Sequence, residues 1–532
     1  MKTYQGVAVS EGIGLGPCFM LDAEEFVIEP STADDAAAEL QRTETAKAQV
    51  AEQLQQQLEQ FGDDPQAEIM QAHLTMLNDP QLASGIKTSI EEDHESAEYA
   101  VSHNLLSYAE MLESLPDEYL RERAQDLRDL RLQWLGALFG KSGLLDVPAG
   151  AIICANELLP SQFLQVRSTG IQGIVTEQGG TTSHVSILAR NFGIPMVTGV
   201  KQSSFEGVQF VAINGQDGQV IADPDENTKQ ALEQSREEFE SMMRDAHENR
   251  YLEAVTKSGQ VIEVAANIGG PDDVEAALEN GADGIGLFRT EFLFMDRSSA
   301  PTEDEQYDVY KRVAEGMQGK RVVIRTLDAG ADKKVSYLHF DDEENPFLGV
   351  RGLRYTLKHS ELFQTQLKAV LRAAAHGRIS LMFPMVTNVA DVEAAVRAVD
   401  EARAALSAQG KAFGDLELGA MIEVPAAALI TDLLAEKLDF VSVGTNDLIQ
   451  YTTASDRMNP EVTQWYEPSH PGLWRLLEQV AKGAHEHGAW VGMCGELAGT
   501  LEFVPRLVEL GFDELSMSPK RIGLVKTAIR KL

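Results

Sequence analysis

A unit repeated along the second half of the chain constrains the fold most. Each unit has a short apolar run, a turn and then a helical pattern. The runs span residues 261–268, 284–290, 321–327, 379–386, 416–423, 439–444, 490–496 and 514–518. Eight strand–helix units within about 280 residues are typical of a (β/α)8 barrel of the TIM type, in which active sites lie at the C-terminal ends of the strands. We therefore predict such a barrel over residues 253–532.

The first half of the chain combines two kinds of pattern. Residues 4–19 and 149–223 contain short apolar runs separated by glycines, and residues 208–224 read as a hairpin. Residues 34–139 follow the helical period instead, in the stretches 36–61, 67–80, 97–115 and 117–139, with breaks predicted at 62–65, 78–80 and 115–117. We predict a β/α domain formed by residues 1–33 and 142–227, with a helical bundle inserted at 34–141. A charged helical stretch, 228–252, is predicted to link this half to the barrel.

Composition narrows the choice of partners and compartment. The chain of 532 residues has 83 acidic and 45 basic residues, a formal charge of −38 that repels nucleic acid and anionic membranes. No apolar run approaches the roughly 18 residues of a membrane span, and the N-terminus lacks a signal pattern. Cys18, Cys154 and Cys494 form no CxxC pair. We expect a cytoplasmic protein without membrane insertion, nucleic-acid partner, disulfide or thiolate metal site.

Polar residues collect where the predicted barrel strands end. They include Arg289, Arg325, Glu423, Asn446, Asp447, Cys494 and Glu496. Any one of them could belong to an ion pair that caps a strand, but five strand ends that carry such residues favour a functional site. Glu423 and Asp447 offer the hard oxygen ligands that suit Mg²⁺, which takes one or two carboxylates and leaves positions for substrate oxygens.

Cationic side chains accompany these carboxylates in the sequence. They are Arg289, Arg325, Lys333, Arg351 and Arg457. The planar guanidinium group matches phosphate and carboxylate geometry, so we expect a small substrate with both groups, bound together with a divalent metal. Cys494 is either a small apolar core residue or a proton donor to an enolate, and its position beside the anion site favours the second role.

The sequence GGTTSH places His184 behind two glycines and three hydroxyl residues, just before a helical pattern that begins near Ser186. A lone histidine is more often a packing or surface residue. Here the glycines allow close backbone approach, Thr182 and Ser183 can orient a ring nitrogen, and a helix N-terminus stabilises a phosphoryl group. We predict that His184 is a nucleophile that accepts phosphate from the anion site of the barrel.

These motifs together identify a family resemblance. The chain resembles the Enzyme I family, the phosphoenolpyruvate-protein phosphotransferases of the bacterial sugar phosphotransferase system. The resemblance is carried by GGTTSHVSILARNFGIPMVTG, GIGLFRTEFLFMDR, VIRTLDAGADK, NPFLGVRGLR, GAMIEVPAAA, DFVSVGTNDLIQYTTASDR and GMCGELAG, with HLTMLNDPQL and YLRERAQDLRDL in the helical stretch. These segments follow the family's order along nearly the whole chain. One departure is Thr181, where some relatives carry arginine.

The resemblance implies a role for each candidate residue. His184 would be phosphorylated, Cys494 would protonate the enolate of pyruvate, and Glu423 and Asp447 would hold Mg²⁺. Phosphoenolpyruvate would be bound by Arg289, Arg325, Lys333, Arg351, Asn446 and Arg457. The bundle would dock the phosphocarrier protein HPr, with Met76, Leu77 and Arg123 near the contact. The family also implies a homodimer formed through the barrel.

Two other functions compete with this interpretation. A nucleotide-dependent dikinase, such as pyruvate phosphate dikinase, shares a phosphohistidine domain and a barrel, but it needs an ATP-binding domain for which the chain has neither the length nor the Gly-rich and Lys pattern. A regulatory protein that senses phosphoenolpyruvate without transferring phosphate would be expected to lose His184, the metal carboxylates or the arginines. All of these residues are present.

Overall fold

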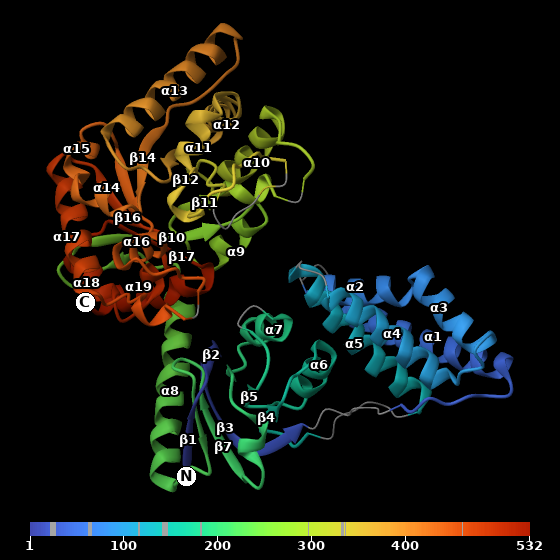
Figure 1. Ribbon diagram of the computed structural model, residues 1–532. Coiled ribbons are helices and arrows are strands. Elements are labelled where there is room, and N and C mark those ends of the chain that lie inside the picture. Colours follow the sequence, from blue (N-terminus) through green and yellow to red (C-terminus); the bar gives the residue numbers. More distant parts are fainter. Residues whose placement is uncertain are drawn as a thin grey trace. The chain divides into compact units, whose positions relative to one another are not determined.

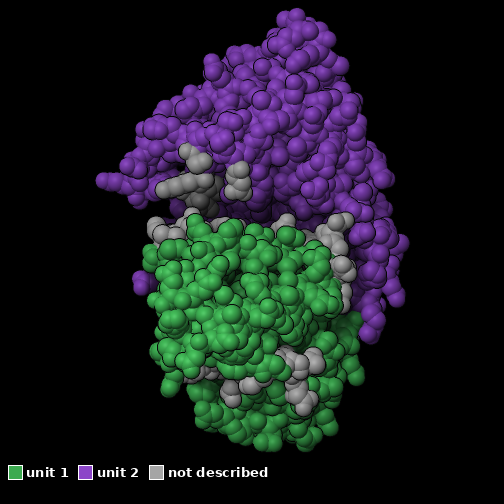
Figure 2. All heavy atoms as spheres, turned by 90° about the vertical axis from the view of Figure 1, so that its right-hand side faces the viewer, with its two compact units in different colours: residues 1–240 green, residues 241–532 purple. Residues whose placement is uncertain are grey.

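The computed structural model describes residues 1–21, 28–61, 66–114, 118–140, 147–180, 183–295, 297–330, 335, 337–459 and 461–532. The chain forms two compact units, residues 1–240 and residues 241–532 (Figures 1 and 2). None of the helices in these described ranges is long and apolar enough to cross a membrane.

The first unit contains a mixed sheet with the strand order β1-β8-β7-β3-β4-β5-β6-β2. The strands are β1 Lys2–Gln5, β2 Val7–Ser10, β3 Ile13–Leu21, β4 Ile152–Ala155, β5 Gly173–Thr176, β6 Met196–Thr198, β7 Phe210–Asn214 and β8 Gln219–Ala222. Strands β3 to β6 pair in parallel, whereas β7 and β8 form the antiparallel hairpin predicted over 208–224. Helices α6 and α7 are connected to strands of the parallel part of the sheet.

Two helices follow β4 and β5 in this sheet, α6 (Pro160–Ser168) and α7 (His184–Phe192). Their apolar residues, among them Phe163, Val185 and Leu188, pack into one buried cluster with sheet residues such as Ile153 and Ile174. Because β4, β5 and β6 are parallel, the segments that leave their C-terminal ends lie along one edge of the sheet. This arrangement brings the loop before His184 next to the segment before α6.

The predicted helical stretch forms a bundle. Its helices are α1 Ala36–Phe61, α2 Gln66–Leu77, α3 Pro80–Glu91, α4 Ala97–Glu113 and α5 Glu118–Leu138. The break predicted at 78–80 is also a helix start. Asp79 accepts hydrogen bonds from the amides of Gln81 and Leu82, and Pro80 occupies the first turn of α3, where its missing N–H costs nothing. The predicted breaks at 62–65 and 115–117 lie outside the described residues.

The second unit is a closed barrel, as the repeat predicts. In the described part of the chain, eight parallel strands pair in sequence order, and β10 pairs with both β11 and β17 to close the ring. The strands are β10 Val261–Ile268, β11 Ile285–Arg289, β12 Val322–Arg325, β13 Ile379–Phe383, β14 Glu417–Ile422, β15 Phe440–Val443, β16 Trp490–Met493 and β17 Glu514–Met517. Each lies within a predicted apolar run. A short strand, β9 (Ala254–Val255), adds to β10 in antiparallel.

Helices surround the strands of the barrel (Figure 1). They are α9 Asp273–Glu279, α10 Glu303–Gly316, α11 Leu353–Lys358, α12 Ser360–Ala373, α13 Val389–Ala408, α14 Pro425–Leu429, α15 Thr431–Ala435, α16 Thr445–Thr453, α17 Pro471–Glu486, α18 Val504–Glu509 and α19 Ile522–Lys531. Most of the charged stretch predicted as a linker, 228–249, lies in α8 (Glu226–Asn249), which contains residues of both units; residues 250–252 follow the helix. The predicted domain boundaries stay predictions.

Candidate active site

His184 is the first residue of α7, and its loop is fixed by local hydrogen bonds. Ser183 is the N-cap: its hydroxyl accepts a hydrogen bond from the Ser186 amide at 3.3 Å. The Ser186 hydroxyl donates to the Gly180 carbonyl at 2.7 Å. Gly179 has a φ of 105°, a backbone conformation that favours glycine. The glycines and hydroxyl residues therefore shape the turn that presents the histidine.

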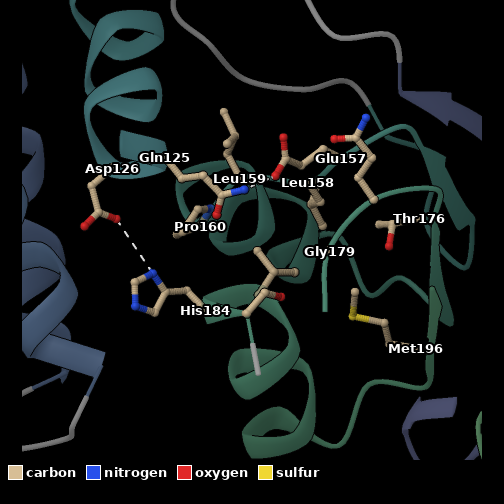
Figure 3. A pocket seen from close by; sticks show the side chains of 13 residues that line it. Gln125, Asp126, Glu157, Leu158, Leu159, Pro160, Thr176, Gly179, His184 and Met196 are labelled. Atoms are coloured by element: carbon tan, nitrogen blue, oxygen red, sulfur yellow. Dashed lines mark hydrogen bonds and ion pairs between the residues drawn. The ribbon is translucent and has the colours of Figure 1, made fainter. Parts of the chain in front are cut away.

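The ring of His184 lines a pocket and faces the bundle rather than these hydroxyls (Figure 3). The pocket is formed by Gln125, Asp126, Glu157, Leu158, Leu159, Pro160, Thr176, Gln178, Gly179, Ser183, His184, Val185 and Met196. Nδ1 of His184 lies 3.7 Å from Oδ1 of Asp126 on α5. The expectation that Ser183 orients the ring is thus wrong, because its hydroxyl is engaged in capping α7. Thr181 and Thr182 lie outside the described residues.

The Asp126 side chain is almost fully buried and lies close to two histidines and an arginine. Its side chain is 1% exposed, against 29% for His184. Nε2 of His73 on α2 lies 3.4 Å from the same carboxylate oxygen, and Arg123 lies 3.1 Å from the other. Burial alone would raise the pKa of Asp126, but the His73 bond and the charges of His73 and His184 lower it. The carboxylate is therefore ionised at neutral pH.

A second group of predicted residues converges at the C-terminal ends of the barrel strands. Arg289 and Arg325 are register partners at the ends of β11 and β12. Arg325 is buried and forms ion pairs with Glu291 and with Asp328, the latter at 3.3 Å. Burial alone would lower the pKa of Arg325, but these carboxylates raise it, so the guanidinium stays charged.

Arg351 and Arg457 reach the same place from other loops. Arg351, 1% exposed, lies 3.1 Å from Asp328 and 3.5 Å from Asp447. Arg457 lies 3.5 Å from the other oxygen of Asp447. The buried guanidinium groups are thus held by fixed carboxylates, which leaves their orientation set before any ligand arrives. Lys333 lies outside the described residues.

The predicted metal ligands lie together in this region. Glu423 follows β14, and its Oε1 accepts a hydrogen bond from the Met385 amide at 2.6 Å. Burial, followed by the charges of Asp447 and Asp328, raises the pKa of Glu423 to about 8. Oδ1 of Asp447 is buried and accepts no hydrogen bond from the described residues. That oxygen is ion-paired with Arg457 at 3.5 Å. A divalent cation would relieve the repulsion between the two carboxylates, so the pair fits Mg²⁺.

The carboxylates do not enclose an ion by themselves. Among the described residues no group of three or more His, Cys, Asp or Glu side chains is arranged to hold a metal. A pair of carboxylates leaves coordination positions for substrate oxygens, which is how magnesium is usually bound at phosphate sites. The donor set therefore suits a metal that is shared with a phosphorylated substrate.

Cys494 and Asn446 complete the predicted barrel residues. The Cys494 thiol is buried directly after β16, and its Sγ lies 3.7 Å from the Val443 carbonyl. Burial raises the pKa of this thiol to about 11, so it carries its proton at neutral pH. Asn446 lies in the first turn of α16, and its side-chain oxygen accepts a hydrogen bond from the Glu496 amide at 3.2 Å.

The three residues predicted at the partner contact have different environments. Leu77 is 1% exposed and belongs to the core of the bundle. Met76 is half-buried and packs against that core. Arg123 on α5 is ion-paired with Asp126. Their role in partner binding stays a prediction.

Sequence reasoning missed several residues of these sites. Glu291 and Asp328 hold the buried arginines, and each follows a barrel strand in the printed motifs FRTEF and RTLDAG. Their position three or fewer residues after a strand end was the available signal. Asp126 and His73 lie on helices of the bundle, and no local pattern connects them to His184.

Comparison with known proteins covers the whole chain. The family models for PEP-utilising enzymes match residues 5–123 (N-terminal), 147–218 (mobile domain) and 243–532 (PEP-binding domain). A phosphoenolpyruvate-protein phosphotransferase of Geobacillus stearothermophilus is 43% identical over 540 residues, which are 100% of this chain and 93% of the relative. Its counterpart in Bacillus subtilis (strain 168) is 40% identical over 545 residues, 100% of this chain and 95% of the relative.

A solved structure was also found. The solution structure of an Enzyme I protein is 31% identical, covers 44% of this chain and 99% of its own, and has a TM-score of 0.38.

Proposed function

The chain belongs to the phosphoenolpyruvate-protein phosphotransferase family, and from this premise we propose the residues that carry its reaction. His184 accepts the phosphoryl group of phosphoenolpyruvate, with release of pyruvate. It then passes the group to the histidine of the phosphocarrier protein HPr, the first step of the sugar phosphotransferase system. The observation that carries this proposal is the convergence of Arg325, Arg351, Glu423, Asp447 and Cys494 at one end of the barrel.

The barrel residues bind and orient phosphoenolpyruvate. Arg289, Arg325, Arg351, Asn446 and Arg457, together with Lys333, neutralise its phosphate and carboxylate groups. Phosphoryl transfer depends mainly on such positioning and charge neutralisation, because the bond changes themselves require little from the protein. The fixed ion pairs of Arg325 and Arg351 support this role, since they hold the guanidinium groups in place without reorganisation.

A divalent metal acts in PEP-utilising enzymes, and we infer that here it is Mg²⁺ held by Glu423 and Asp447. When bound, the metal supplies positive charge at the phosphate oxygens. Burial and neighbouring carboxylates raise the pKa of Glu423 to about 8. A bound cation would offset this carboxylate repulsion, which supports the assignment.

Cys494 donates a proton to the leaving group. A nitrogen of His184 attacks phosphorus, the bond from phosphorus to the enol oxygen breaks, and its electron pair leaves with pyruvate enolate. The Cys494 thiol then protonates carbon 3 of the enolate to give pyruvate. The high pKa of the buried thiol supports this assignment, because a thiolate could not act as the donor.

The proposed partners and compartment rest on the resemblance to the family. HPr docks on the bundle, two copies of the chain associate through the barrel, and the protein works in the cytoplasm. Because the phosphoryl group is received at the barrel and delivered at the bundle, the two units must move, and α8 connects them. Crosslinking the units in one arrangement should permit only one of the two transfers, and a locked protein that turns over fully would refute the motion.

Phosphorylation with labelled phosphoenolpyruvate and Mg²⁺ tests the proposal. The wild-type protein should acquire an acid-labile, alkali-stable label that is absent from His184→Ala. A parallel incubation with ATP labelled in its phosphates addresses the dikinase alternative, which predicts labelling of His184 from ATP. A protein that binds phosphoenolpyruvate but acquires no label from it would be the regulatory sensor instead.

A further inference from the structure

We propose that Asp126 is a positioning residue for the transfer between His184 and the phosphocarrier protein, where it keeps the proton on Nδ1 of His184. This inference rests on the proposed function. The Asp126 carboxylate on α5 lies 3.7 Å from Nδ1 of His184 in the pocket of Figure 3.

The carboxylate is held in place from several elements. His73 of α2 binds the oxygen that faces His184, and Arg123 of α5 binds the other oxygen. Asp129, one turn further along α5, is also close enough to raise the pKa of His73, and Glu157 lines the pocket on its far side. With 1% of its side chain exposed and an ionised state favoured by these neighbours, Asp126 cannot turn away to solvent.

A carboxylate at this place decides which ring nitrogen is the nucleophile. In a neutral imidazole one nitrogen carries a proton and the other a lone pair, and the hydrogen-bond partner of one nitrogen sets the state of the other. Asp126 lies 3.7 Å from Nδ1, which is beyond hydrogen-bond distance, and the negative charge of its carboxylate beside that nitrogen favours the proton on Nδ1. Nε2 then carries the lone pair and exchanges the phosphoryl group.

The same proton matters when the phosphoryl group departs. Transfer to the phosphocarrier protein breaks the bond between phosphorus and Nε2, whose electron pair returns to the ring, while a ring nitrogen of the acceptor histidine forms the new bond to phosphorus. If Nδ1 keeps its proton, the leaving group is a neutral imidazole instead of an imidazolate anion. Asp126 stabilises that protonated ring and does not itself gain or lose a proton.

The location of Asp126 predicts which half-reaction depends on it. Asp126 belongs to the bundle, where the phosphocarrier protein docks in the proposed function, whereas the phosphoenolpyruvate ligands belong to the barrel unit. Its contact with His184 is available when the histidine faces the bundle. Asp126 should therefore support exchange with the phosphocarrier protein more than phosphorylation by phosphoenolpyruvate.

Rapid-quench measurements of the two half-reactions on the full-length protein test this division. In Asp126→Asn, the rate of transfer from phosphorylated His184 to HPr should fall at least about tenfold, while phosphorylation by phosphoenolpyruvate should change less than about threefold. Glu39→Gln is the matched control. It removes a mostly buried carboxylate of the bundle that binds Arg42 and the Ala97 amide instead of His184, and the ratio of its two rates should equal that of the wild type.

Two further measurements separate positioning from a structural role. Asp126→Glu, which keeps the charge, should recover part of the lost transfer rate. Nitrogen-15 NMR of the unphosphorylated wild-type protein, labelled in its histidine rings, should show the proton of neutral His184 on Nδ1, and Asp126→Asn should move population to the other tautomer. The wild-type spectrum needs no variant to fold.

The outcomes also distinguish this inference from the proposed function. Equal losses in both half-reactions for Asp126→Asn, or a wild-type His184 whose proton sits on Nε2, would overturn the role of Asp126. Absence of any label on His184 from phosphoenolpyruvate would overturn the proposed function instead, and the tautomer measurement would still decide whether Asp126 sets the state of the ring.

Discussion

Arg325 at the end of β12 forms a buried ion pair with Glu291, which follows the neighbouring strand β11. Both side chains are almost fully buried, so the pair fixes one edge of the guanidinium group. The protein thereby sets the orientation of this group. This contact fixes Arg325 where it can serve the proposed anion site, beside Glu423 and Asp447, the proposed metal ligands.

Replacing Arg325 with lysine should impair substrate use although the charge is kept. A single ammonium group cannot bind Glu291, Asp328 and a substrate oxygen in the planar arrangement of a guanidinium. We expect kcat/KM for phosphoenolpyruvate to fall about 100-fold or more, which corresponds to about 3 kcal/mol of lost transition-state stabilisation. The control Arg378→Lys alters an exposed ion pair with Glu417 and should leave kcat/KM near the wild-type value. A small effect at Arg325 would remove it from the substrate site.

Substitution of Cys494 by alanine should affect the fate of the enolate rather than binding. The buried thiol, with its pKa raised to about 11, carries its proton through the neutral range. Without it, enolpyruvate should leave unprotonated at carbon 3 and gain its proton in solution, so pyruvate made from a stereospecifically labelled substrate in heavy water should lose its chirality at that carbon. Cys154→Ala, in the sheet of the first unit, is the control. Retained chirality in Cys494→Ala would assign the proton to another group.

The neighbouring residues Met76 and Leu77 should respond differently to truncation. Leu77 lies in the core of the bundle, so Leu77→Ala should destabilise it by about 2 to 5 kcal/mol, measured by urea unfolding. Met76 is half-buried, and Met76→Ala should weaken HPr binding in calorimetry with a smaller loss of stability. Normal HPr affinity in Met76→Ala would place the docking surface elsewhere on the bundle.

Glu514 should make the stability of the barrel depend on pH. It begins β17 inside the barrel, and burial, followed by the charge of Glu263, raises its pKa to about 8 from an ordinary value of 4.5. Between these values the folded state binds a proton that the unfolded state releases. The stabilisation is therefore complete below about pH 4.5 and is lost as the pH rises through about 8.

This dependence can be measured by thermal unfolding between pH 6 and pH 9. Over this range the wild type should lose on the order of 2 kcal/mol of its free energy of unfolding because Glu514 ionises. Glu514→Gln should not show this loss, because its amide has no proton to release. Glu401→Gln, at an exposed position on α13, should keep the wild-type dependence. Parallel pH curves for wild type and Glu514→Gln would show that the carboxyl titrates at its ordinary value.

Local patterns predicted much of the barrel and of its site. The eight apolar runs contain the eight barrel strands of the described chain, because a buried parallel strand needs a short continuous apolar segment wherever it occurs. The ends of those strands predicted Arg325, Glu423, Asp447 and Cys494 as one site, since all strands of such a barrel end on the same face. The helix α3 was missed because Asn78-Asp79-Pro80 signals a break as well as a start.

Contacts between distant segments were not predictable in the same way. Ser183 was expected to orient the ring of His184, but its hydroxyl caps α7, and the ring faces Asp126 of the bundle. The capping interaction is local and competes successfully for the hydroxyl. The contact with Asp126 depends on how a helix of the bundle packs beside the sheet, which the spacing of residues within either segment does not encode.

The sequence by itself determined the closed barrel, the helix start that carries His184, and the residue types at the barrel's strand ends, because these follow from periodicity and turn chemistry within short windows. Only the tertiary structure decided that Glu291 anchors Arg325, that Leu77 belongs to a core, and that Asp126 faces Nδ1 of His184. The reason is that a local pattern sets which face of an element is apolar, whereas the partner of a buried polar group is set by the packing of elements that are far apart in the chain.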